Sequence, residues 1–202
     1  ELVSTVSESG ATTVQSTLAM SDFGEVAALW VQRNNPSALY QIMCRVRAAD
    51  GAWADEMVVR EGTGLLAFPE ASMNASGDVM VVWQEMVSEV FTVRGRLWTA
   101  AAGTWSGVET YSEGGSHAGL AQVDTDATGR TVVLWRQADT PQEGWTLATT
   151  GHLAARTRSA SGELSPVTQV SPMGQDAFHT AIETRKQNIM MHPDGSAAVT
   201  WS

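Results

Sequence analysis

A glycine followed six residues later by a tryptophan recurs four times in this 202-residue chain, and this repeat constrains the fold more than any other feature. The residues between glycine and tryptophan are apolar or β-branched, which predicts a short strand buried on both faces. Each glycine ends a segment containing Asp, Asn or Ser, the composition of a tight turn in which glycine supplies a positive φ. The four pairs are Gly24 and Trp30, Gly77 and Trp83, Gly129 and Trp135, and Gly195 and Trp201.

A second glycine turn follows each of the first three tryptophans. Its copies are Asp50-Gly51-Ala52-Trp53, Ala102-Gly103-Thr104-Trp105 and Ser161-Gly162-Glu163-Leu164. Arginine pairs precede these turns at Arg45 and Arg47, Arg94 and Arg96, and Arg156 and Arg158. The middle pair lies three residues further from its glycine than the other two pairs do. A longer spacing before the last Gly-Trp pair indicates an insertion around residues 184–188.

Each copy has room for four strands joined by short connections, which predicts an antiparallel meander. In the second copy the strands are expected at Ala67–Met73, Asp78–Glu85, Val90–Thr99 and Ser106–Ser112. Four-stranded meanders that recur about every fifty residues are typical of β-propeller blades. The prediction is an all-β, propeller-like array over residues 1–202, with three complete blades and parts of a fourth. The units are approximately 11–61, 62–113, 114–171, and a partial unit of 172–202 with 1–9.

The ends of the sequence match only parts of a unit, so we expect the array to be incomplete. A fourth blade would combine Phe178–Thr184, Ala197–Ser202 and Val3–Ser9 and would lack its third strand. Because an open sheet leaves backbone groups unpaired, another chain or a second copy is expected to supply the missing strands. Two copies would give about seven to eight blades.

The repeat resembles the propeller repeats of bacterial secreted and cell-surface proteins, in which a small turn ending in Gly leads into a strand ending in Trp. It is also distantly similar to the Asp-box repeats of sialidase-type propellers. The nearest match is Ala48-Ala49-Asp50-Gly51-Ala52-Trp53, and its two counterparts lack the Asp. The resemblance implies an extracellular, cell-surface or periplasmic location in a bacterium.

A sialidase-type site would need three converging arginines, a tyrosine nucleophile assisted by a glutamate, and an aspartic acid. The chain has two tyrosines, Tyr40 and Tyr111, and each lies in or beside a predicted repeat strand. The arginine pairs recur between units, which favours a structural role over a single active site.

Charge and composition exclude several classes of partner. The net charge is −10, with 22 acidic and 12 basic residues, which argues against a nucleic-acid ligand. No apolar run reaches the roughly 18 residues of a membrane-spanning helix, and the N-terminus shows no signal-peptide pattern. The single cysteine, Cys44, lies in an apolar run and is predicted to be a buried structural thiol.

The sequence shows no catalytic pattern, no metal site and no cofactor motif. The histidines lack the spacing of a zinc site, and His117 and His192, beside turns, are expected to be exposed. The run Asp124–Gly129 superficially resembles a calcium loop but lacks the acidic residue that an EF-hand has twelve positions on, so a turn is predicted. Gly-rich phosphate loops and a Gly-x-Ser-x-Gly elbow are also absent.

Tryptophan, with eight residues, is the one unusual feature of the composition. The repeated Trp30, Trp83, Trp135 and Trp201 are predicted to be core, and Trp53 and Trp105 to pack near the rim of a unit. Trp98 and Trp145 lie outside the repeat and are the candidate ligand-binding residues. Trp145 is the stronger candidate, because it falls in an inserted hairpin and exposed aromatic rings stack on sugars or protein partners.

Three functions remain open from the sequence. The first is a non-catalytic binding or scaffolding propeller module of a secreted or cell-surface protein, which recognises a glycan or a protein. The second is a fragment of a sialidase-like glycoside hydrolase. The third is a structural spacer, which would show neither a pocket nor an exposed aromatic patch.

Overall fold

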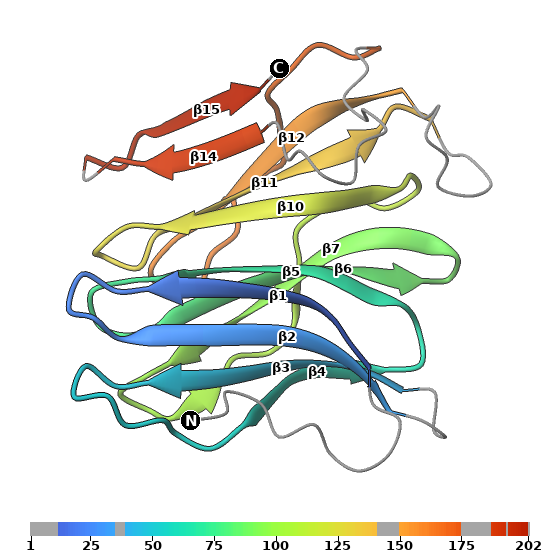
Figure 1. The fold of residues 1–202 in the computed structure, drawn as a ribbon. Helices are drawn as coiled ribbons and strands as arrows, with labels where there is room; N and C mark the ends of the chain where they lie inside the picture. Colours follow the sequence, from blue (N-terminus) through green and yellow to red (C-terminus); the bar gives the residue numbers. More distant parts are fainter. Residues whose placement is uncertain (1–11, 35–38, 141–149, 175–186, 193, 202) are drawn as a thin grey trace.

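The computed structural model describes residues 12–34, 39–140, 150–174, 187–192 and 194–201, and these residues form four antiparallel sheets (Figure 1). The first sheet contains β1 (Thr12–Met20), β2 (Val26–Asn34), β3 (Leu39–Arg47) and β4 (Met57–Gly62). The second contains β5 (Leu66–Met73), β6 (Val79–Val87), β7 (Val90–Thr99), β8 (Thr104–Trp105) and β9 (Glu109–Thr110). The third contains β10 (Ala118–Thr125), β11 (Thr131–Ala138), β12 (Gly151–Arg158) and β13 (Thr168–Gln169). The fourth contains β14 (Gln187–Met191) and β15 (Ala197–Trp201).

The all-β class and the four-stranded antiparallel sheets are confirmed. In the second sheet, β5, β6 and β7 lie close to the predicted strands. The predicted fourth strand is instead two short strands, β8 and β9, which both pair with β7. The ladder is interrupted at Ser106, whose hydroxyl accepts a 2.9 Å hydrogen bond from the Leu97 N–H in place of a backbone carbonyl.

The fourth sheet differs from the sequence prediction at its start. Gln187 and Asn188, expected in an insertion, are the first residues of β14 and pair with Trp201 and Thr200. The tight turn fixes this register, because the first strand of each sheet ends four residues before its turn glycine. The predicted strand Phe178–Thr184 lies outside the described residues. Nowhere in the described part of the chain is there a helix that could cross a membrane.

The sheets stack one on another in chain order, from β1–β4 at one end to β14–β15 at the other (Figure 1). The first strands β1, β5, β10 and β14 lie next to one another along the stack. The turns after β1, β10 and β14, drawn in blue, yellow and red, all lie on the left in Figure 1. Within the described residues the stack does not close into a ring, since β1 and β14 lie at opposite ends.

The second strand of each central sheet is buried on both faces, as its sequence predicts. β11 is buried throughout, and β6 is buried from Val79 to Glu85. Because side chains alternate along a strand, Val81 and Trp83 face the first sheet and pack with Leu29 and Ile42. Met80 and Val82 face the opposite way and pack in the cluster of the third sheet.

Three of the four repeated tryptophans are core residues, as predicted, and each makes the same hydrogen bond; the side chain of Trp201 lies outside the described residues. Trp30, Trp83 and Trp135 are at most 4% exposed. Each indole N–H donates to the side chain two residues later, which is Gln32 (3.1 Å), Glu85 (3.1 Å) or Gln137 (3.0 Å). The repeat is therefore Gly-x5-Trp-x-Gln/Glu, with the polar residue satisfying the buried indole.

The predicted glycine turns are also confirmed. Gly24, Gly77, Gly129 and Gly195 have φ values of 89°, 78°, 85° and 88°, a region that strongly favours glycine. Each glycine N–H donates to the carbonyl three residues earlier. Cys44 is fully buried, as expected, and burial raises the pKa of its thiol to about 12.

The second sheet carries Glu85 where its neighbours carry glutamine, and this carboxylate is 5% exposed. Arg60 of β4 donates to it twice, from Nη2 at 2.6 Å and from Nε at 3.2 Å. The Arg94 Nε lies 3.8 Å from the same carboxylate. A buried carboxylate held by arginines is stable only while both charges are present. Glu85 therefore joins the first and second sheets by an ion pair.

The position two residues after the repeated tryptophan holds Glu85 in the second sheet and Gln137 in the third. We predict that replacing either residue by the type found in the other sheet destabilises the fold. Glu85→Gln leaves Arg60 without its carboxylate and is expected to lower the free energy of unfolding by about 1–3 kcal/mol. Gln137→Glu removes an amide that donates to Ser116 Oγ and to backbone carbonyls, and buries a charge, for a loss of about 2 kcal/mol or more. Urea unfolding of both variants tests this. A neutral effect of either exchange would contradict it.

Candidate functional site

One arginine of each recurring pair binds a backbone carbonyl, and these three arginines do not gather at a site. Strand register makes Arg45, Arg96 and Arg156 equivalent, since each pairs with the residue four positions after its turn glycine. Their Nε atoms donate to the carbonyls of Ala54 (2.7 Å), Ser106 (3.0 Å) and Ser165 (2.5 Å). Each acceptor lies three residues after the second turn glycine. Arg96, and not Arg94, is thus the counterpart of Arg45 and Arg156.

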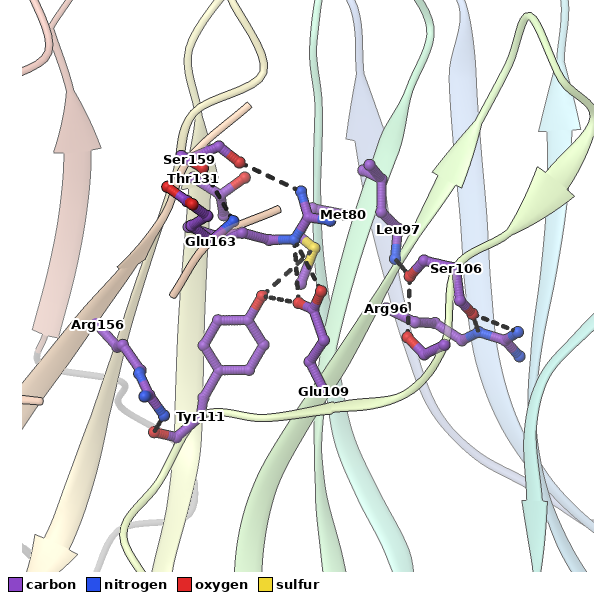
Figure 2. Close-up of polar contacts among 12 residues, drawn as sticks. Met80, Arg96, Leu97, Ser106, Glu109, Tyr111, Thr131, Arg156, Ser159 and Glu163 are labelled. Carbon is purple, nitrogen blue, oxygen red and sulfur yellow. Dashed lines mark hydrogen bonds and ion pairs between the residues drawn. The ribbon is translucent and has the colours of Figure 1, made fainter. Parts of the chain in front are cut away.

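Two of these arginines also join consecutive sheets, and we call this contact the arginine bridge. Arg96 Nη1 donates to the Val59 carbonyl of the preceding sheet at 2.7 Å. Arg156 Nη1 donates to the Thr110 carbonyl at 3.2 Å. Figure 2 shows Arg96 at Ser106 and Arg156 beside Tyr111. A planar guanidinium suits this role because its donors point in several fixed directions.

The tryptophans of the second turn support the same arginines. The guanidinium of Arg45 lies 5.5 Å from the ring centre of Trp53, and that of Arg96 lies 5.4 Å from that of Trp105. Both rings are partly buried. In the third sheet Leu164 takes this place. It forms an isolated antiparallel β-bridge with Arg158, as Trp53 does with Arg47. These aromatic residues pack against the repeat's own arginines.

Tyr111 is fully buried between the second and third sheets. Its hydroxyl donates to Glu109 at 2.9 Å, and Arg158 Nε lies 3.0 Å from the same carboxylate oxygen (Figure 2). Burial, followed by the charge of Glu109, raises the pKa of this phenol well above its ordinary value. A phenolate nucleophile is disfavoured here, so the Tyr–Glu pair fits a buried structural contact.

The two candidate ligand-binding tryptophans are placed differently. Trp145 lies outside the described residues. Trp98 is partly buried at the end of β7, where it pairs with Trp105 and packs against the core between the first two sheets. The two ring centres are 5.4 Å apart at an interplanar angle of 55°.

The expectation that His117 is exposed is wrong, since only 1% of it is accessible. Its Nδ1 accepts a 3.1 Å hydrogen bond from the Phe91 N–H, and the two rings are 5.6 Å apart. The reason is that His117 directly precedes β10, which packs on β7 of the second sheet. His192 is exposed, as expected.

A cavity of about 500 Å³ lies where the first strands of the four sheets end. It is formed by the ends of β1, β5 and β10, the turns that follow them, and Met191 of β14. Its polar lining residues are Asp22, Ser72, Asn74, Asp124, Thr125, Asp126 and Thr128. No arginine, lysine or histidine is among the described residues that line it. The cavity is therefore acidic and rich in hydrogen-bond acceptors.

Asp124 holds three sheets together at this cavity. Its Oδ1 accepts a 3.2 Å hydrogen bond from the Ser72 hydroxyl of β5. Its Oδ2 accepts a 2.7 Å hydrogen bond from the Met191 N–H of β14. The Ser72 hydroxyl in turn accepts from the Thr125 N–H at 3.0 Å. These bonds fix the relative positions of the strands that form the cavity wall.

The run Asp124–Gly129 ends in a turn, as predicted. Asp126 Oδ1 accepts from the N–H groups of Thr128 (2.9 Å) and Arg130 (3.0 Å), and Oδ2 lies 2.7 Å from Arg130 Nε. Burial alone would raise the pKa of Asp126, but the hydrogen bonds from Thr128 and Arg130 outweigh it and lower the pKa. The described residues contain no group of three or more acidic, His or Cys side chains placed to hold a metal.

Sequence reasoning missed Ser72 and the cross-sheet role of Asp124 in the cavity. Both lie five residues before their turn glycine, so a comparison of this position between repeats would have found two polar residues in predicted strands. The cavity itself has no local signal, because it forms only where four separate strands meet.

Comparison with known proteins assigns no family to the chain. No protein-family model matches it, and no curated protein matches it.

We predict that Arg96→Lys lowers the free energy of unfolding by about 1–3 kcal/mol, because one ammonium cannot reach both Ser106 and Val59. Arg33→Lys is the matched control, since Arg33 is exposed, and it should change stability by less than about 0.5 kcal/mol. Urea denaturation gives both values. Equal effects of the two substitutions would show that the arginine bridge adds nothing to stability.

The lowered pKa of Asp126 predicts a pH dependence of stability. Its carboxylate stabilises the fold above the unfolded-state pKa of about 3.9, and this contribution is lost as the pH falls through the lower folded-state pKa. The destabilisation caused by Asp126→Asn should thus be constant near pH 7 and shrink below about pH 4. Urea unfolding at about pH 7, 5 and 3 measures it, with Asp22→Asn on the equivalent turn as control. A difference that does not change with pH would rule out this account.

Proposed function

We propose that this chain is a non-catalytic binding module of propeller-like architecture, and that the cavity at the ends of the first strands binds a neutral, hydroxyl-rich ligand such as a glycan. The observation that carries the proposal is the lining of this cavity, which combines three carboxylates with hydroxyl and amide groups and contains no basic side chain among the described residues.

The volume of the cavity suits a small ligand. About 500 Å³ falls within the range of ligand-binding pockets, and the wall is held in place by Asp124 and Ser72 before any ligand arrives. A preformed wall reduces the entropy lost on binding. In a propeller-like array the ends of the inner strands gather around the central axis, which supports a ligand site at this position.

The chemistry of the wall favours hydrogen-bond donors. A carboxylate accepts about four hydrogen bonds. Asp124 accepts three within the chain and keeps acceptor capacity, whereas Asp126 already accepts four, from Thr128 and Arg130. Asp22 is exposed at the rim. Sugar hydroxyls donate to such oxygens, whereas a carboxylate or phosphate ligand would meet like charge. Neutral glycans therefore fit better than sialylated or phosphorylated ones.

The other functions have less support. A sialidase-like hydrolase needs an accessible tyrosine and arginines free to bind a substrate. Tyr111 is buried, and Arg96 and Arg156 are bound to backbone carbonyls, which disfavours this function. A structural spacer does not require a polar cavity. A protein ligand, and stacking of a sugar on Trp145, remain compatible with the proposal, as does the bacterial secreted or cell-surface location that the repeat's resemblance implies.

The test is binding to a panel of neutral and sialylated oligosaccharides, followed by calorimetry on the neutral oligosaccharide that binds best. Asp22→Asn, which removes an exposed carboxylate at the rim, should weaken that binding by about fivefold to tenfold, because one charge-assisted hydrogen bond is lost. Asp55→Asn is the control, since it makes the same change at an exposed residue that does not line the cavity. Binding of no neutral sugar, or equal loss in both variants, would overturn the proposal.

A further inference from the structure

Arginines outnumber carboxylates where the outer strand of the first sheet meets the second sheet. Arg60 of β4 and Arg94 of β7 both lie beside Glu85, with their Nε atoms 3.2 Å and 3.8 Å from the same carboxylate oxygen. Within the described residues, Glu85 is the one carboxylate in ion-pair contact with either arginine. These three side chains together therefore carry one excess positive charge.

Arg94 is the less satisfied of the two arginines. It lies directly opposite Trp83 in the antiparallel pair, so both side chains are on the face that meets the first sheet. Its Nε is buried and makes no hydrogen bond to the described residues. At 3.8 Å its contact with Glu85 is an ion pair that is too long for a hydrogen bond. A buried polar atom without a partner is one sign of a site for an ion or a water.

A third arginine adds to the positive charge. Arg96 lies two residues after Arg94 in β7, so its side chain is on the same face. It donates to the carbonyl of Val59, the residue before Arg60. Burial, and then the positive charge of Arg60, lower the pKa of Arg96. Repulsion between like charges of this kind is expected where one carboxylate, Glu85, serves a cluster of arginines.

The open side of this cluster presents guanidinium groups. The side chains of Arg60 and Arg94 are 33% and 25% exposed, whereas that of Glu85 is 7% exposed. Arg60 holds Glu85 through Nε and Nη2, which leaves its Nη1 as a donor. Both arginines are thus accessible to a ligand from solvent, while the carboxylate that they share is covered.

We propose that Arg60 and Arg94 form a binding site for a small oxyanion, that is, a phosphate or carboxylate group. Guanidinium groups bind these anions through paired, charge-assisted hydrogen bonds. The ligand would neutralise the charge that Glu85 leaves, and Glu85 would compete with it for the same two arginines. None of these residues lines the cavity, so the site is separate from the proposed glycan site and does not depend on it.

The test is titration calorimetry with inorganic phosphate and with acetate, at an ionic strength kept constant with sodium chloride. We expect at least one of the two anions to bind with a dissociation constant of about 1 mM. Tighter binding of phosphate identifies a phosphate site, and tighter binding of acetate identifies a carboxylate site. Binding of neither anion up to about 20 mM would overturn the proposal.

Arg94→Gln should weaken binding of the preferred anion by about tenfold or more, because one of the two guanidinium groups is lost. The matched control is Arg33→Gln, which removes the same charge from an exposed position of the first sheet. It should leave the affinity within about twofold of that of the wild-type chain. Equal weakening in both variants would show that the anion responds only to overall charge, and would refute the site.

Glu85→Gln separates an anion site from a purely structural ion pair. Because the competing carboxylate is removed, this variant should bind the anion about tenfold more tightly than the wild-type chain. A ligand that binds only the folded state stabilises it, so the anion should also raise the urea midpoint of Glu85→Gln more than that of the wild type. An equal or smaller rise would contradict the proposal.

If Glu85→Gln does not fold, the comparison of Arg94→Gln with Arg33→Gln decides the question by itself. Arg94→Gln is expected to fold, because the Arg94 side chain takes part in an ion pair but in no hydrogen bond among the described residues. These assays contain no sugar, so their failure is distinguishable from failure of the proposed binding function.

Discussion

Burial of the second strand on both faces is the constraint on which the rest of the structure depends. Alternate side chains of β6 pack into two different clusters, one shared with the first sheet and one with the third. No single sheet can bury such a strand, so the second strand of each central sheet is covered by the sheets before and after it. Stability is then shared between neighbours along the stack, as in other repeat proteins.

Polar contacts reinforce this stack at both edges of the sheets. Arg96 and Arg156, in the third strands of their sheets, donate to carbonyls of the preceding sheet. Along the first strands, Asp124 accepts from Ser72 of one neighbouring sheet and Met191 of the other. Side chains of the types common in active sites are thereby used for structure. The same is true of Tyr111 and Glu109, which lie in a buried network with Arg158.

The cavity lies at the ends of the first strands of the sheets. There, the turns bring carboxylates and hydroxyls of three sheets to one cavity, with no basic residue among those described. The net negative charge of the chain is thus also found locally, in the acidic wall of the cavity.

The sequence by itself determined the local pattern of the fold. Turn chemistry and strand periodicity depend on residues close in the chain, so the glycine turns, the buried second strands and the core tryptophans could be predicted from spacing. The tertiary structure decided everything that depends on residues far apart. It buried His117 against Phe91, aligned Arg96 rather than Arg94 with the other arginines, and split the fourth strand at Ser106. It also formed the cavity, because the distance between residues such as Ser72 and Asp124 is set by how sheets pack and not by any spacing along the chain.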